Sequence, residues 1–263
     1  MTALEAPSLE HGGAAIWRIN PVAKLAAAAI LGFVLVLSID WMSAAVALAL
    51  ETVLFPFAGL TPRRFLVRTL PVVIAAPLAA LTILLYGEPA GATYAEFLLV
   101  HVTDGSIELA VATLLRFFAI GLPALVLFVT VDPTDLADGL AQVLRLPARF
   151  VLGALAGLRL AGLFVEDWRS LELARRARGV ADAGRLRRFA GQAFSLLVLS
   201  VRRGSRLATA MEARGFGAPT ARTWARESRM GRREAVLVAL AVGVATASVT
   251  ASVATGHWNL ILG

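Results

Sequence analysis

The chain has 263 residues, of which 58% are hydrophobic and 16% are charged, whereas an ordinary soluble domain carries about 25% charged residues. We therefore expect a polytopic membrane protein in place of a soluble domain. The chain contains no cysteine, which excludes disulfide bonds and thiolate metal sites. Residues 1–15 have no basic segment of the signal-peptide kind, so the first apolar run is expected to remain as a membrane anchor.

A membrane-spanning helix needs about 20 mostly apolar residues. Five runs approach this length, and they cover residues 22–39, 43–58, 70–86, 107–131 and 235–256. The loop at 87–106 carries acidic residues and neither lysine nor arginine, whereas basic residues precede the first run and separate the second from the third. The positive-inside rule then places the N-terminus in the cytoplasm and the 87–106 loop outside.

Two ionisable side chains, Glu51 and Arg116, lie inside these apolar runs. Each is about nine residues from the outer end of its predicted span, so a rise of 1.5 Å per residue gives both a similar depth. Ionisable groups at such depth usually pair or face a protein interior. We predict that Glu51 and Arg116 are partners. In the alternative, Arg116 packs on backbone carbonyls, while Glu51 is protonated or faces another subunit.

A basic segment follows the fourth run: residues 133–233 hold 19 arginines and 8 acidic residues. In a membrane protein this bias indicates a cytoplasmic segment, and nucleic-acid binding is not expected. Asp132 can cap a helix that begins at Pro133. The segment is predicted to form three amphipathic helices below or at the membrane surface, at about 133–144, 149–178 and 185–214.

The predicted fold is therefore all-α, with about five transmembrane helices and a cytoplasmic domain of three amphipathic helices between spans four and five. Its domains are a membrane domain of four spans at 1–131, a cytoplasmic domain at 132–233, and the last span with the C-terminus at 234–263.

The two long cytoplasmic helices end in the same three residue types. Ala177-Arg178-Gly179 closes one helix, and Ala213-Arg214-Gly215 closes the other. Glycine accepts the left-handed conformation that stops a helix, and arginine complements the negative end of the helix dipole. A single copy would be explained as a helix stop. The second copy, also at the end of a long cytoplasmic helix, favours a shared function.

The paired Ala-Arg-Gly ends resemble the coupling helices of the transmembrane (T) component of energy-coupling-factor transporters. Residues 20–25 (NPVAKL) are similar to the family's Pro-x-x-Lys-Leu signature, and residues 211–216 (MEARGF) resemble its second motif. Asp132-Pro133, Leu146-Pro147 and Leu158-Arg159 follow in the family's order.

The resemblance implies a coupling subunit of an ABC-type importer in the bacterial cell membrane, which takes up a vitamin or a metal ion. Its partners would be two cytoplasmic ATPases, which bind ATP and Mg²⁺, and a small substrate-binding membrane subunit; the chain itself would hold no cofactor. Arg178 and Arg214 would each dock in a groove of one ATPase, and Arg175 and Arg176 would support the first contact.

The same helices carry large apolar side chains that are expected to form a broad platform. These are Leu152, Leu155, Leu158, Phe164 and Trp168 on one helix, and Phe194, Leu197 and Val201 on the other. Such a surface is too apolar to face water. Either this apolar surface packs only between the two crossing helices, or it additionally slides against the substrate-binding subunit.

Other functions have less support in the sequence. Asp132, Asp135 and Asp138 resemble part of the Mg²⁺-diphosphate motif of membrane prenyltransferases, but a second acidic cluster exists only as Glu166-Asp167, among arginines. The permease of another ABC importer would couple through one short helix. The chain lacks a Walker A motif, and its three histidines lie in separate segments without ligand spacing, so neither an enzyme nor a metal site is expected.

Overall fold

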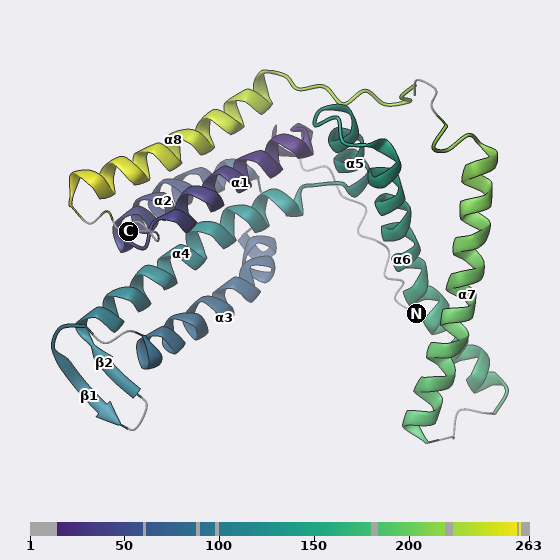
Figure 1. Ribbon diagram of the computed structural model, residues 1–263, viewed down its shortest axis with the longest axis horizontal. Helices are drawn as coiled ribbons and strands as arrows, with labels where there is room; N and C mark the ends of the chain where they lie inside the picture. The colour runs from purple at the N-terminus through teal and green to yellow at the C-terminus, as the bar shows by residue number, and fades with distance from the viewer. Residues whose placement is uncertain are drawn as a thin grey trace. The chain divides into compact units, whose positions relative to one another are not determined.

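The computed structural model describes residues 15–59, 62–87, 90–97, 100–179, 184–218, 223–256 and 258. Helices account for most of these residues, which confirms the predicted all-α membrane protein (Figure 1). The chain forms two compact units. Unit 1 comprises Met1–Leu136 and Arg229–Gly263, and unit 2 comprises Ala137–Ser228.

Unit 1 is a bundle of apolar helices. Its elements are η1 (Ala15–Arg18), α1 (Pro21–Leu37), α2 (Trp41–Leu54), η2 (Phe55–Ala58), α3 (Pro62–Tyr86), α4 (Asp104–Val129) and α8 (Arg232–Ala254). Helix α3 packs along α4, α1 packs along α8, and α2 contacts both α4 and α8 (Figure 1). Small side chains such as Ala27, Ala47, Ala119 and Ala245 are buried where these helices meet. Small residues allow the close backbone approach that holds membrane helices together.

The described residues contain four helices that are long and apolar enough to cross a membrane: Phe65–Tyr86, Asp104–Val129, Ala148–Ala177 and Arg232–Ala254. The first two predicted spans correspond to shorter apolar helices, Pro21–Leu37 and Trp41–Phe57. Ala148–Ala177 includes the stretch that we interpreted as interfacial because of its charges. Its length and composition also suit a span, so its cytoplasmic position stays a prediction.

The connection between α3 and α4 contains a β-hairpin that the sequence analysis did not anticipate. Strands β1 (Thr93–Phe97) and β2 (Val100–Thr103) pair antiparallel, with Thr93 opposite Thr103. Thr103 then caps α4, because its side chain accepts a hydrogen bond from the Ser106 amide at 3.3 Å. The β-branched and aromatic residues of this segment are the signal that was available for the strands.

The first turn of α1 forms hydrogen bonds with residues of unit 1 that are distant in the sequence. Asn20 caps α1 by accepting from the Val22 amide at 3.0 Å, and its Nδ2 donates to the Arg229 carbonyl at 3.2 Å. Lys24 is almost fully buried, and its Nζ donates to the carbonyl and the hydroxyl of Thr130, both at 2.8 Å. An aspartate at position 20 could not donate to Arg229, which gives a physical reason for the asparagine found there.

Asp40, in the loop between α1 and α2, organises a buried polar cluster. Its carboxylate accepts from the Ser43 amide at 2.6 Å, from the Ser43 hydroxyl at 2.8 Å and from the Ser252 hydroxyl of α8 at 2.6 Å. Burial on its own would raise the pKa of Asp40. The hydrogen bonds from Ser252 and Ser43 outweigh burial and hold this pKa below its ordinary value. The cluster therefore caps α2 and fastens α8 to the α1–α2 loop.

Unit 2 is built on two long helices, α6 (Ala148–Ala177) and α7 (Arg185–Ala213), and α5 (Pro133–Gln142) leads into it. As predicted, Asp132 caps α5: its Oδ1 accepts from the Thr134 amide at 2.7 Å. Helices α6 and α7 contact each other through a two-point ion pair, with Arg203 Nη1 and Nη2 at 2.5 and 3.2 Å from the Asp167 oxygens. The same two helices also meet through the rings of Trp168 and Phe189, whose centroids lie 5.5 Å apart.

Candidate functional site

The two Ala-Arg-Gly triplets adopt the same backbone arrangement at the ends of α6 and α7. In each triplet the alanine is the last helical residue and the arginine is the C-cap. The glycine that follows is left-handed, with φ of +67° at Gly179 and +76° at Gly215. At the end of α7, the Gly215 and Phe216 amides donate to the Glu212 and Met211 carbonyls, both at 2.9 Å, which is a Schellman motif.

Both glycines are required by the backbone and not by lack of space. A Cβ built on Gly179 or Gly215 would meet no atom within 4 Å. A side chain at either position would nevertheless be strained, because residues other than glycine rarely adopt such positive φ angles. Each triplet therefore fixes the direction in which the chain leaves the helix, and with it the position of the preceding arginine.

Arg178 and Arg214 are exposed, and the side chain of neither forms a hydrogen bond or an ion pair with another described residue. Their neighbours behave differently. Arg175 Nη1 donates to the Arg188 carbonyl of α7 at 3.2 Å, and Arg176 Nη2 lies 2.6 Å from Glu172 Oε1 on its own helix. Of these four arginines, only the two C-cap residues have side chains without a partner among the described residues.

An apolar platform, defined here as the eight large apolar residues predicted on α6 and α7, leaves much of its surface exposed. Leu158 is 63% exposed on α6, and Leu197 is 58% exposed on α7. Phe194 and Val201 are exposed as well, while Leu155 and Phe164 are half-buried. Contact between α6 and α7 alone therefore does not cover the platform.

The predicted pairing of Glu51 with Arg116 is wrong. Arg116 donates from Nη2 to the carbonyl of Ser38, which is the C-cap of α1. Glu51 is buried, and neither of its carboxyl oxygens has a hydrogen-bond partner among the described residues. Arg116 therefore packs on a backbone carbonyl, which is the alternative given above. The physical reason is that the last carbonyls of α1 lack partners within their own helix.

No group of three or more potential metal ligands comes together among the described residues. His11 and His257 lie outside the described residues. Neither the Asp40 cluster nor the contacts of Lys24 were predicted from the sequence, although both involve polar residues at the ends of apolar runs. Such positions are a usable signal, because a polar group beside a span needs a partner.

The chain is similar to known transport proteins. The family described as "Cobalt transport protein" (CbiQ) matches residues 13–224. The energy-coupling factor transporter transmembrane protein EcfT of Exiguobacterium sibiricum is 31% identical over 166 residues, which are 59% of this chain and 63% of the relative. EcfT of Limosilactobacillus fermentum is 29% identical over 164 residues, 58% of this chain and 61% of the relative. The match thus spans about three fifths of the length of these relatives.

Proposed function

Because the chain belongs to the CbiQ cobalt transport protein family, we propose that it is the transmembrane coupling subunit of an energy-coupling-factor importer. In this function it transmits ATP-driven motion from two cytoplasmic ATPases to a small substrate-binding membrane subunit. The cargo is a vitamin or a metal ion, which the substrate-binding subunit selects. The chain catalyses no reaction itself, and ATP and Mg²⁺ are bound by the ATPases.

One observation carries this proposal: two long helices of unit 2 end in the same cap, each with an exposed arginine whose side chain has no partner among the described residues. A guanidinium offers five donors in a planar fork, which suits carboxylates and carbonyls in a protein groove. Two identical ends suit two related partners. Arg178 and Arg214 would each dock on one ATPase, with Arg175 and Arg176 holding the end of α6 in place.

The apolar platform is proposed to contact the substrate-binding subunit. Affinity purification of the tagged chain from its host membranes should recover two ATPases and a small membrane protein. Leu155→Glu and Leu197→Glu should each lose the small membrane protein and retain the ATPases, because a buried charge without a partner is costly at an apolar interface. Recovered subunits are identified by mass spectrometry.

Leu186→Glu is the control for these variants, since Leu186 is 83% exposed on α7 and is not part of the platform. It should retain every subunit. Loss of all subunits in the platform variants, with an aggregated chain, would instead mean that the platform serves the fold of unit 2. Recovery of one ATPase pair without a small membrane protein would favour the permease of another ABC importer.

We further propose that the protein lies in the bacterial plasma membrane with its N-terminus and unit 2 on the cytoplasmic side. The chain has no native cysteine, so single cysteines can be introduced and labelled with a membrane-impermeant maleimide. A cysteine at Gly184 should be labelled only after the cells are opened, whereas one at Thr93 in the hairpin should be labelled in intact cells. Labelling of position 184 in intact cells would overturn this topology.

A further inference from the structure

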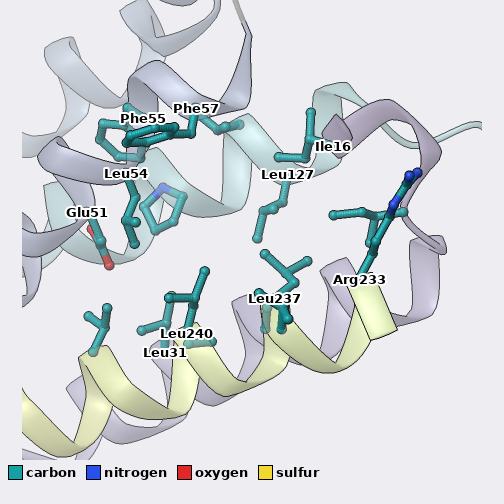
Figure 2. Close-up of a pocket in the computed structure, with 17 residues that line it drawn as sticks. Ile16, Leu31, Glu51, Leu54, Phe55, Phe57, Leu127, Arg233, Leu237 and Leu240 are labelled. Atoms are coloured by element: carbon teal, nitrogen blue, oxygen red, sulfur yellow. The ribbon is translucent and has the colours of Figure 1, made fainter. Parts of the chain in front are cut away.

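A pocket of about 290 Å³ lies inside unit 1, among α1, α2, α4, α8 and the two 3₁₀ helices η1 and η2 (Figure 2). Ligand pockets begin at about this size, roughly 300 Å³. Among the described residues that line it, all side chains are apolar except those of Glu51 and Arg233. Figure 2 shows these two at opposite ends, with leucines between them.

Glu51 is the unusual member of this wall. It is 3% exposed, and neither carboxyl oxygen has a hydrogen-bond partner among the described residues. Its carboxyl group points into the space between α2 and α8 (Figure 2). A buried carboxyl group without a partner destabilises a protein, so a molecule that donates a hydrogen bond to it gains binding free energy.

Neither the described part of the chain nor a buried water supplies that donor. Arg116, the cation we expected to pair with Glu51, donates to the Ser38 carbonyl instead. A buried water needs about two to four polar partners. Of the described residues at this end of the pocket, only Glu51 provides a polar side chain, and the surrounding walls are formed by residues such as Leu31, Leu240 and Val244.

The rim of the pocket indicates where an occupant comes from. Phe57, Val236 and Leu240 line the pocket and are 77%, 58% and 44% exposed. They belong to apolar helices of a membrane protein, and exposed apolar side chains on such helices face lipid. An occupant that enters past them comes from the bilayer and carries an apolar body.

We propose that this pocket binds an amphiphile with an aliphatic chain and a terminal hydroxyl or amino group, which donates a hydrogen bond to Glu51. The chain packs along Leu31, Leu237 and Leu240, whose side chains lie between the two ends (Figure 2). The chemistry fits a membrane lipid with a donor group or a free long-chain alcohol or amine. The site is separate from the helix ends of unit 2 and does not depend on the transport function.

The test uses the purified full-length chain in detergent and two photoreactive probes, dodecanol and dodecane that carry a diazirine in the same position. Dodecanol should label pocket residues roughly three to ten times more strongly than dodecane, which is the effect of one hydrogen bond. Glu51→Leu should reduce this ratio to about one while the chain stays folded, since the substitution removes an unpartnered buried carboxyl group. Labelled residues are located by peptide mass spectrometry.

Two further variants make the result specific. Arg233→Gln changes the other polar residue of the pocket and should keep the preference for dodecanol, whereas Leu240→Trp should fill the pocket and abolish labelling by both probes. Equal labelling of the wild type by both probes, or a preference that survives Glu51→Leu, would overturn the proposal.

Native mass spectrometry of the protein taken directly from cell membranes distinguishes the two sources of the ligand. A bound lipid mass that is lost in Leu240→Trp identifies a membrane lipid. Absence of such a mass, together with dodecanol labelling that depends on Glu51, identifies a free amphiphile.

Discussion

Replacing both C-cap arginines, Arg178→Ala with Arg214→Ala, is expected to separate the chain from the two ATPases proposed as its partners. A hydrogen bond to a charged group contributes about 1.5–3 kcal/mol, which is roughly one to two decades in affinity for each arginine. The two sites lie on different helices, so their losses should add. Affinity is measured between the reconstituted chain and the purified ATPases, together with uptake by whole cells.

The variants should leave the fold intact, because both arginines are exposed and their side chains form no bond with another described residue. Arg206→Ala is the matched control, since Arg206 is an exposed arginine of α7 that lies about two turns before the helix end. Arg178→Lys and Arg214→Lys should recover only part of the affinity, because an ammonium group cannot reproduce the planar fork. If the double variant assembles and transports like the wild type, the coupling function of these helix ends is disproved.

Asp40→Ala is expected to destabilise unit 1 more than any other single substitution proposed for this protein. It removes the cap of α2, the bond to Ser252 of α8, and the negative charge that interacts with Arg116. Removal of one member of a buried charged cluster costs about 3–5 kcal/mol. The measurement is the free energy of unfolding in mixed micelles, followed by circular dichroism.

Two comparisons identify the source of that loss. Ser252→Ala removes one hydrogen bond to the carboxylate and should cost about 1.5–3 kcal/mol, whereas Glu108→Ala, at an exposed acidic residue of α4, should have little effect. The stability that Asp40 supplies should also depend on pH, because the pKa of Asp40 is lower in the folded protein than its ordinary value of 3.8. The contribution of Asp40 to the free energy of unfolding is therefore complete above about pH 4 and disappears as the pH falls below that value. Equal stability of Asp40→Ala and the wild type at pH 7 would contradict the proposed importance of the cluster.

The sequence predicted those features that depend on local chemistry. The C-terminal ends of α6 and α7 followed from their Arg-Gly pairs, and the start of α5 followed from Asp132 before Pro133, because caps are determined by a few neighbouring residues. The triplets could be identified for the same reason. Their function remains a proposal, since it concerns other molecules.

Contacts between distant helices could not be predicted in the same way. Counting residues along each helix placed Glu51 and Arg116 at a similar depth in the membrane. It did not determine how each helix is rotated about its own axis. Arg116 bonds to the end of α1, and Glu51 faces the pocket. Both outcomes depend on how α1, α2, α4 and α8 are rotated against one another, and hydrophobic runs without a polar stripe carry little information about rotation.

The contacts of α1 have a consequence for the modular architecture of the chain. Asn20 and Lys24, one helical turn apart, hold Arg229 and Thr130. Thr130 and Arg229 lie close to the points where the chain leaves unit 1 and returns to it. Unit 2 is thus an insertion in unit 1, and the two segments that lead into it and out of it are hydrogen-bonded to the same turn of one helix. Insertions with neighbouring stems add little entropic cost to the host fold, so evolution could lengthen or exchange this insertion while the membrane bundle stays the same.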